Sequence, residues 1–294
     1  MKKSIVCFVI VCITLLTFFG CGSTPRQTGE VVFVPNVDTV GVWWWARSTN
    51  INGPYLDFLA RNGATEIYFS SSVFGQETSD FIARAFEKGI KVYWLQGDHT
   101  WIHDDSVFRD RYAQYLVYQA NAPENRRFAG VHIDVEPHQD PLWRADRENR
   151  PMLLRKFLDF VMNLRRDFPN EHFDFDIPFW LSDDIEYRGQ MVPLHQAIIR
   201  EADRVFIMSY RDSAERIFNL RTVSDQIEFA RSLGKPIFLS AESSNPPEGN
   251  TVISFRDRGK RAMYEELNKL KYMVNYENFG IAIHHARTWY NLKD

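Results

Sequence analysis

Three ionisable side chains alternate with three apolar ones in the segment Val131 to Glu136, which reads VHIDVE. Successive side chains of a β-strand point to opposite faces, so His132, Asp134 and Glu136 share one face and the apolar residues share the other. A carboxylate raises the pKa of a carboxyl group beside it, so Asp134 can keep Glu136 protonated. The spacing therefore predicts acid–base chemistry with Glu136 as the proton donor.

Other polar side chains stand at the ends of further strand-like segments. Asp176 alternates with apolar residues in FDFDIP, Tyr210 ends RVFIMSY, Glu242 follows PIFLSA and His284 ends GIAIH. If these segments are parallel strands of one closed sheet, their carboxyl ends meet at one mouth. We therefore expect these four side chains to converge with Asp134 on the same site.

The chain alternates strand-like and helix-like segments from Thr39 onward. Eight strand-like segments, rich in β-branched and aromatic residues, lie at 40–45, 65–70, 91–96, 130–136, 173–178, 204–210, 236–241 and 280–284. Seven helix-like segments lie at 55–61, 79–88, 107–120, 152–167, 194–201, 223–232 and 261–276. This order predicts an α/β protein with a (β/α)8 barrel. About ten residues follow His284, too few for a full eighth helix, so we expect an incomplete rim that the segment before Thr39 covers.

The composition is that of one large folded domain. The chain has 294 residues, of which 45% are hydrophobic and 25% are charged, and this can bury a substantial core. The net charge is −3, and no stripe of Lys and Arg is interleaved with aromatic residues. We therefore expect no nucleic-acid partner, and we expect a monomer.

The N-terminus has the features of a targeting segment. Lys2 and Lys3 precede an apolar run at 5–19 that ends at Gly20-Cys21. This resembles a bacterial lipoprotein signal, which implies lipidation of Cys21 and anchoring in the cell envelope, in the outer membrane with a periplasmic or surface-exposed body. Simple secretion and an uncleaved membrane anchor are the alternatives. We therefore divide the chain into a signal peptide at 1–20, a tether at 21–38 and a barrel domain at 39–294, and expect no internal disulfide in the mature protein.

Two motifs carry a resemblance to a known enzyme family. The segment Gly130 to Glu136 resembles the signature of chitinase-type glycoside hydrolases of family 18, an Asp-Gly-x-Asp-x-Asp-x-Glu run on the fourth barrel strand, and Met208-Ser209-Tyr210 resembles the Met-x-Tyr on the sixth. The resemblance implies that Glu136 is the general acid, that Asp134 orients the N-acetyl group of the substrate and that Tyr210 supports this group. The chain departs from the family at four positions: Ala129 and His132 replace Asp, Arg211 replaces Asp, and His284 replaces Trp.

A second resemblance competes with the first. Glu136-Pro137 on the fourth strand and Glu242 on the seventh are similar to the pair of glutamates in retaining glycosidases of clan A, although Val135 stands in place of an Asn. This resemblance implies that Glu242 is a nucleophile. Both resemblances imply hydrolysis of a glycosidic bond with Glu136 as acid, so the expected partner is a carbohydrate. The alternative from another class is a lipoprotein that keeps the barrel but only binds carbohydrate or has a structural role.

Aromatic side chains and one long loop complete the expected site. Flat indole rings suit sugar binding, and the substrate-binding candidates are Asp176, Trp45, Trp94, Trp180, His284 and Trp289. We expect no cofactor and no metal, because the sequence has no compact ligand motif. The loop 243–259 follows the seventh strand and contains Pro246, Pro247 and Gly249, so we expect it to cover part of the cleft.

Overall fold

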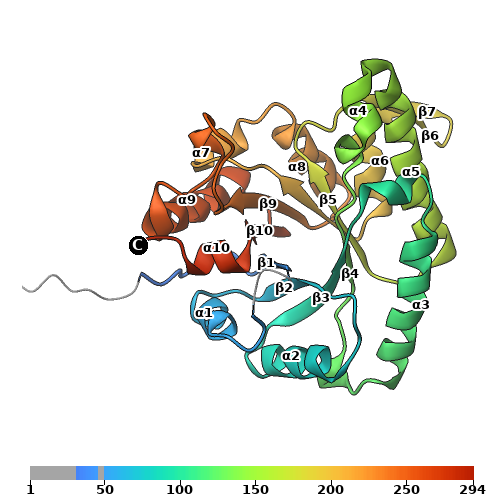
Figure 1. Cartoon of the computed structure of the whole chain (residues 1–294). Helices are drawn as coiled ribbons and strands as arrows, with labels where there is room; N and C mark the ends of the chain where they lie inside the picture. The colour runs from blue at the N-terminus through green and yellow to red at the C-terminus, as the bar shows by residue number, and fades with distance from the viewer. Residues whose placement is uncertain (1–30, 46–49) are drawn as a thin grey trace, which may run out of the picture. The chain divides into compact units, whose positions relative to one another are not determined.

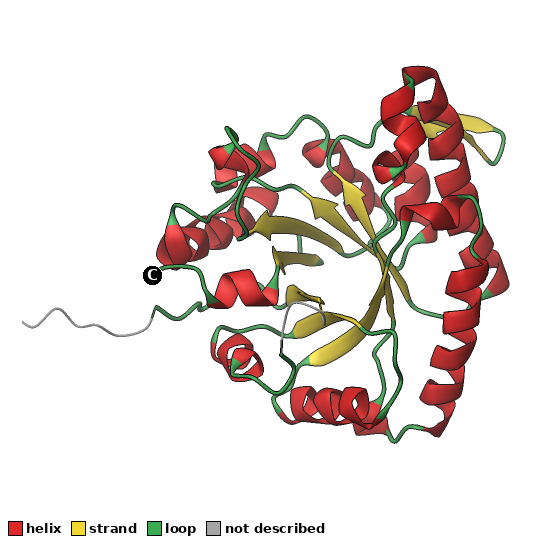
Figure 2. Cartoon of the chain, viewed as in Figure 1, coloured by secondary structure: helices red, strands yellow, loops and turns green. Residues whose placement is uncertain are grey.

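The computed structural model describes residues 31–45 and 50–294. Cys21, the predicted signal peptide and most of the predicted tether lie outside these residues. Eight parallel strands form a closed barrel with the strand order β1-β10-β9-β8-β5-β4-β3-β2. The strands lie at the centre of the molecule and helices surround them (Figures 1 and 2). The predicted (β/α)8 barrel is therefore confirmed.

The elements follow the predicted alternation. The barrel strands are β1 Val40–Trp45, β2 Glu66–Ser70, β3 Lys91–Gln96, β4 Val131–Ile133, β5 Phe173–Pro178, β8 Arg204–Met208, β9 Ile237–Glu242 and β10 Phe279–His284. The longer helices are α1 Tyr55–Arg61, α2 Gln76–Glu87, α3 Ser106–Asn121, α5 Arg150–Asp167, α6 Leu194–Glu201, α8 Val223–Ser232 and α9 Gly259–Val274. These seven helices correspond to the seven predicted ones.

Several short elements were not predicted. They are the helices α4 Pro141–Ala145, α7 Ala214–Phe218 and α10 Ala286–Tyr290, the hairpin strands β6 Asp184–Tyr187 and β7 Gln190–Pro193, and 3-10 turns at His99–Ile102, Glu124–Arg126, Pro137–Gln139, Arg147–Asn149 and Thr251–Ile253. The hairpin lies at the edge of the molecule, away from the barrel strands (Figure 2). Helix α2 begins at Gln76 rather than at Ser79, because the Ser79 N–H already donates to the carbonyl oxygen of Gly75 as part of the helix.

The barrel strands are buried on both faces. Val131, Ile133 and Val135 belong to the layer between the strands and the helices, and each is at most 1% exposed. Trp43 and Phe206 belong to a separate cluster inside the barrel. This arrangement confirms the predicted alternation of faces along the fourth and sixth barrel strands, which are β4 and β8.

The fourth strand is shorter than predicted, but its side chains keep their alternation. Regular pairing ends at Ile133, and the Asp134 N–H still donates to the Gln96 carbonyl oxygen. The backbone stays extended at Glu136, and Pro137, which has no N–H, opens a 3-10 turn. The two carboxyl groups therefore stand just beyond the strand, on the inward side.

The compact unit of the described residues begins at Val31. Phe33 is 1% exposed and stacks on Tyr264 with ring centroids 4.7 Å apart. Its backbone N–H also donates to the Asn62 side chain over 2.8 Å. Residues 31–38 therefore pack on the barrel because they carry a large apolar side chain that a solvated tether would expose.

The last helix, α10, has only five residues, as the short C-terminal segment predicts. Its Trp289 packs against Phe58 of α1, and the indole N–H donates to the hydroxyl of Tyr264 over 2.9 Å. Since Tyr264 also stacks on Phe33, the incomplete eighth helix and the segment before Thr39 fill the same part of the rim. Within the described residues, no helix is long and apolar enough to cross a membrane.

An ion network occupies the interior of the barrel below the site. Arg204, at the start of β8, places Nη1 2.8 and 2.9 Å from the two carboxylate oxygens of Glu66. Its Nε and Nη2 lie 2.8 and 2.6 Å from the carboxylate oxygens of Asp174. The guanidinium also lies over the Tyr93 ring, 4.4 Å from its centroid. One buried cation therefore joins two buried carboxylates across the barrel.

Candidate active site

A cavity of about 490 Å³ opens at the carboxyl ends of the barrel strands. Its lining combines carboxyl groups, imidazoles and indoles from several strands and from the loops that follow them. The lining residues are Trp43, Trp45, Gly97, Asp98, His99, Asp134, Glu136, Gln139, Asp176, Met208, Tyr210 and His284. Sites of (β/α)8 enzymes lie at this end of the barrel, so this cavity is the candidate site.

Two larger hollows adjoin the cavity and share residues with it. One, of about 740 Å³, shares Trp45, Gly97 and Asp98 with the cavity. The other, of about 660 Å³, shares Glu136 and Gln139. The concave surface therefore continues beyond the cavity at two places.

Asp134 and Glu136 reach the cavity because the chain passes very close to Gly97. A Cβ atom at position 97 would lie 1.9 Å from the Asp134 carbonyl oxygen, so any side chain there would displace the backbone that carries the carboxyl groups. The Glu136 side chain is 17% exposed. The acid predicted from the sequence therefore stands at an accessible surface.

Both carboxyl groups have an increased proton affinity. Burial, and then the negative charge of Asp176, raises the pKa of Glu136 to about 7, while His284 opposes the increase. Burial, followed by the charges of Asp176 and Glu136, raises the pKa of Asp134 well above its ordinary value. Near neutral pH the site can therefore present a carboxylic acid, which is the form that donates a proton.

Two hydrogen-bond donors hold the Asp176 carboxylate. Its Oδ2 accepts hydrogen bonds from the Trp43 indole N–H over 3.1 Å and from His132 Nε2 over 2.9 Å. Its Oδ1 has no hydrogen-bond partner among the described residues. One oxygen of Asp176 is therefore fixed by two hydrogen bonds, and the other is buried without a partner among the described residues.

His284 and Glu242 form a chain of hydrogen bonds at the side of the cavity. The Trp45 indole N–H donates to His284 Nε2 over 3.1 Å, so Nδ1 carries the imidazole proton and donates to Glu242 Oε2 over 2.8 Å. The other Glu242 oxygen accepts the Ser244 N–H over 2.7 Å. Burial disfavours the carboxylate, but the His284 hydrogen bond lowers the pKa of Glu242 below its ordinary value. Glu242 is thus a fixed carboxylate beside the cavity and is not among the residues that line it.

Tyr210 lines the cavity as predicted. Burial, together with the nearby charges of Glu242, Asp176 and Asp134, raises the pKa of its phenol well above the ordinary value. The hydroxyl therefore remains a neutral group that can donate a hydrogen bond.

Comparison with solved structures gives matches of similar architecture at low sequence identity. The spore cortex-lytic enzyme SleL of Bacillus megaterium QM B1551 matches with a TM-score of 0.52 and 12% identity, over 88% of this chain and 74% of that chain. The family 18 chitinase ChiB of Flavobacterium johnsoniae matches with a TM-score of 0.47 and 13% identity, over 86% and 89% of the two chains. The glycoside hydrolase domain of PelA from Pseudomonas aeruginosa matches with a TM-score of 0.44 and 14% identity, over 86% and 97%.

The chain shares its barrel fold with the spore cortex-lytic enzyme SleL. No protein-family model matches the sequence, and no curated protein is similar to it. At such low identity the similarity concerns the fold alone. The chemistry must therefore be argued from the side chains in the cavity.

Three of the predicted sugar-binding indoles lie elsewhere. Trp94 is fully buried on the outer side of the barrel, where it stacks on Tyr115 and its N–H donates to the Ser71 carbonyl oxygen. Trp289 is fully buried against α1, as described above. The prediction that Trp94 and Trp289 line the cleft is therefore wrong, because both indoles fill the layer between strands and helices. Trp180 is half-buried beside Trp143 and is not among the lining residues.

The loop 243–259 was expected to cover the cleft, and none of its residues lines the cavity. Instead, Phe255 is fully buried and its N–H donates to the Glu242 carbonyl oxygen over 2.9 Å. The Ser254 hydroxyl donates to the Ser244 carbonyl oxygen over 2.5 Å. The loop therefore folds back on the end of β9, and the lid prediction is wrong.

Several lining residues were not predicted, and they come from two loops. Gly97, Asp98 and His99 follow β3, and Gln139 is the last residue of the 3-10 turn after Glu136. The sequence signal was the position of these residues directly after a strand, at the end of the barrel where sites form. Within the described part of the chain, no group of three or more His, Cys, Asp or Glu side chains is placed to hold a metal ion.

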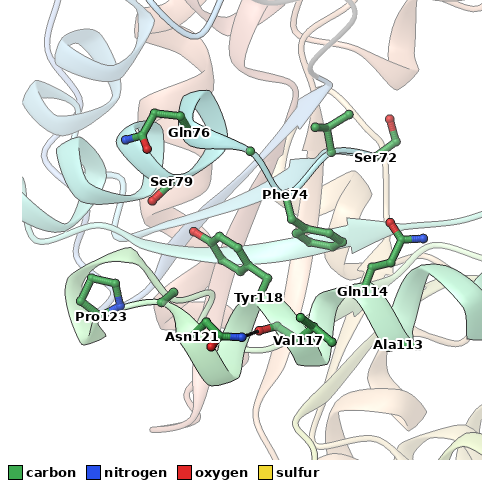
Figure 3. A pocket seen from close by; sticks show the side chains of 13 residues that line it. Ser72, Phe74, Gln76, Ser79, Ala113, Gln114, Val117, Tyr118, Asn121 and Pro123 are labelled. Carbon is green, nitrogen blue, oxygen red and sulfur yellow. Dashed lines mark hydrogen bonds between the residues drawn. The ribbon is translucent and has the colours of Figure 1, made fainter.

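A wider cavity of about 890 Å³ lies on the outside of the barrel, between the start of α2 and the second half of α3 (Figure 3). Phe74 and Tyr118 stack within it, with ring centroids 5.5 Å apart. Its lining contains serine, amide and apolar side chains but no carboxyl, imidazole or cationic group from the described residues. Of the two cavities, the smaller one at the strand ends is therefore the one lined by carboxyl and imidazole groups.

Proposed function

We propose that this protein hydrolyses glycosidic bonds, with Glu136 as the general acid. One observation carries the proposal: Glu136 and Asp134 line an open cavity at the carboxyl ends of the strands, and the surroundings of Glu136 favour its protonated form near neutral pH. Cleavage of a glycosidic bond requires such an acid to protonate the leaving oxygen. A barrel that only binds carbohydrate would not need to raise the proton affinity of an accessible carboxyl group.

The second requirement of the reaction is stabilisation of the oxocarbenium-like centre, either by a carboxylate nucleophile or by the substrate's own amide. Both Glu242 oxygens already accept hydrogen bonds, from His284 and from Ser244. Asp134 and Tyr210, in contrast, line the cavity beside Glu136. This arrangement supports a substrate-assisted route, in which Asp134 and Tyr210 hold an N-acetyl group against the reacting carbon.

We infer that the substrate is a glycan longer than one sugar, located outside the cytoplasm. The two hollows that adjoin the cavity support this length, because a chain of several sugars can extend into them while its scissile bond lies at the acid. The names of two proteins of similar fold, a spore cortex-lytic enzyme and a chitinase, suggest glycans to include in a substrate screen.

The test of the proposed function is hydrolysis of defined glycans by the full-length protein. The panel contains polymeric glycans and chromogenic glycosides, each in N-acetylated and non-acetylated form. We expect reducing ends to be released from N-acetylated polymers. If no glycan is cleaved while some are bound, the protein is a carbohydrate-binding lipoprotein and the proposal is wrong.

The two routes make opposite predictions for Asp134 and Glu242. With N-acetylated substrate, we expect Asp134→Asn to lower kcat by about tenfold or more, because the amide replaces a carboxyl group that orients the substrate. We expect Glu242→Gln to lower kcat by about threefold or less. If Glu242 is instead the nucleophile, Glu242→Gly will be inactive, azide will restore part of its activity, and non-acetylated substrates will react.

We further propose that lipidation of Cys21 anchors the protein in the bacterial cell envelope. Cys21→Ala removes the thiol that receives the lipid, so we expect this variant to remain unprocessed or to become soluble. Partitioning into detergent on phase separation measures the outcome, and Cys12→Ala is the matched control. Equal partitioning of the Cys21→Ala and wild-type proteins would contradict the anchor.

A further inference from the structure

His132 lies at the centre of the barrel between two carboxylates. Its side chain is 0% exposed, with Nε2 2.9 Å from Asp176 Oδ2 and Nδ1 3.6 Å from Asp174 Oδ2. The ring stacks on Tyr68 with centroids 4.0 Å apart and an interplanar angle of 18°. Phe206 packs its ring edge-on, 4.6 Å away. His132 is therefore held in one orientation by aromatic rings, with a carboxylate facing each ring nitrogen.

The two carboxylates differ in their other partners. Asp174 has two contacts to Arg204, at 2.8 and 2.6 Å, and a third to His172 at 2.7 Å. Asp176 accepts from the neutral Trp43 indole and makes no contact with Arg or Lys in the described parts of the chain. His132 is thus the side chain that can supply Asp176 with a positive charge.

A buried carboxylate without a cation usually takes up a proton instead. Burial disfavours the His132 imidazolium, but the Asp176 charge, the hydrogen bond to Asp176 and the nearby Asp174 carboxylate raise the pKa of His132 to about 9. The imidazole is therefore charged at neutral pH, and Asp176 can remain a carboxylate deep in the barrel. The chain has this cation where the family 18 signature has an Asp.

We propose that His132 is a positioning residue: as a buried imidazolium it holds Asp176 as an oriented carboxylate facing the cavity, and this carboxylate keeps the proton on Glu136. The last step rests on the proposed function, since Glu136 is the acid only if the protein is a glycosidase. The first two steps concern charges that exist without substrate.

The groups around Glu136 support this coupling. After burial, the Asp176 charge is the largest influence that raises the pKa of Glu136, and His284 on β10 acts in the opposite direction. His138 Nε2 lies 3.4 Å from Glu136 Oε1, and burial lowers the pKa of His138, which keeps it neutral. Asp134 shares the cavity and has a raised proton affinity of its own. Of these neighbours, Asp176 is the one whose negative charge depends on His132.

The remaining groups near His132 are already paired with one another. Tyr68 on β2 donates its hydroxyl to Glu66 over 3.2 Å, and Glu66 is paired with Arg204 of β8. Tyr93 on β3 contributes a hydroxyl that stays neutral, because burial raises the pKa of this phenol above its ordinary value. Neither phenol can replace the missing charge if His132 is removed. Loss of the imidazolium therefore leaves Asp176 as a buried carboxylate without a cation among the described residues, the condition under which carboxylates in general take up protons.

Nuclear magnetic resonance of the full-length protein tests the first two steps without substrate. With ¹⁵N-labelled histidine, we expect both His132 ring nitrogens to carry protons at pH 7. With ¹³C-labelled carboxyl groups, we expect Glu136 to titrate about one pH unit lower in His132→Gln than in wild type, because Asp176 then takes the proton. Asp176→Asn should move the Glu136 titration in the same direction, and the double variant no further than the larger single effect.

The matched control is His172→Gln, which removes an imidazole from the same network on the far side of Asp174. His172 does not contact Asp176, and Asp174 retains Arg204, so the Glu136 titration should stay at its wild-type position. A structural role of His132 alone would lower stability in His132→Gln and leave the Glu136 titration unchanged, and that result overturns the inference. A neutral His132 ring at pH 7 in wild type also overturns it, and this measurement needs no variant to fold.

Activity then tests the last step. In the pH profile of kcat/KM we expect the alkaline limb to move to lower pH by the same amount as the Glu136 titration, in His132→Gln and in Asp176→Asn. If glycans are hydrolysed and the limb does not move, the inference fails while the proposed function stands. If no glycan is hydrolysed and the titrations move as expected, the proposed function fails while the charge arrangement stands.

Discussion

Glu136→Gln is expected to lower kcat by about 10² to 10⁴-fold, the range attributed to a positioned general acid. Glutamine has nearly the same shape as glutamic acid and cannot donate a proton to the leaving oxygen, so the barrel should stay folded. The measurement is the turnover of the best glycan from the substrate screen. Glu148→Gln is the matched control, because it makes the same chemical change at an exposed residue outside the cavity.

The pH dependence of kcat/KM gives a second test of Glu136 as the acid. Burial and the Asp176 charge raise the pKa of Glu136 to about 7, so the acid is protonated below pH 7 and loses its proton above it. Wild-type kcat/KM should therefore fall as the pH rises through about 7, and the residual activity of Glu136→Gln should lack this alkaline limb. A Glu136→Gln protein with wild-type kcat would show that Glu136 is not the acid.

The parts of this site that the sequence predicted are those that depend on strand parity. The alternation in VHIDVE fixes which side chains of the fourth strand face inward, because the apolar ones must pack under helices. The same argument placed Asp176, Tyr210 and His284 at the cavity. The alternation of faces could not place Trp94 correctly, because β3 reads KVYWLQ and is apolar on both faces. Either face of such a strand can be buried, so the sequence does not say which one points into the barrel.

Short elements and pairings across the barrel escaped prediction for different reasons. Helices of five residues such as α10 are too short to show a helical period. The β6–β7 hairpin carried a local signal, since Arg188-Gly189 forms a two-residue turn with φ of 52° and 80°, but one Gly among polar residues is a weak signal. The contact between His132 and Asp176 joins residues 44 positions apart. Only the closed sheet brings such residues together, and the sequence alone does not identify which partners will meet.

Arg204 is the clearest case of a residue whose role the sequence did not indicate, and its removal should have the largest effect on stability. The guanidinium is paired with both Glu66 and Asp174 inside the barrel. Arg204→Met fills a similar volume but leaves two buried carboxylates without their cation. We expect the free energy of unfolding at pH 7 to fall by about 3–5 kcal/mol, measured by chemical denaturation, because breaking a buried ion pair leaves charge uncompensated.

Two comparisons separate the loss of charge from the loss of packing. Arg155→Met removes an exposed pair with Asp159, whose side chains are 41% and 49% exposed, and should cost about 0–1 kcal/mol. The triple variant Arg204→Met, Glu66→Gln, Asp174→Asn removes the two carboxylates as well, so it should recover part of the stability that Arg204→Met loses.

The sign of the pH dependence follows from the same pairing. Burial opposes the Asp174 charge, but Arg204 holds the pKa of Asp174 well below its ordinary value, so this carboxylate stabilises the wild-type fold at neutral pH and loses that contribution only in strong acid. In Arg204→Met the Asp174 carboxylate takes up a proton more readily, so the difference in unfolding free energy between variant and wild type should narrow as the pH is lowered. Two results would contradict the role of the charge: a loss of unfolding free energy below about 1 kcal/mol in Arg204→Met at pH 7, or a difference from wild type that increases in acid. Either would mean that the aromatic rings around the guanidinium, rather than its charge, stabilise the centre of the barrel.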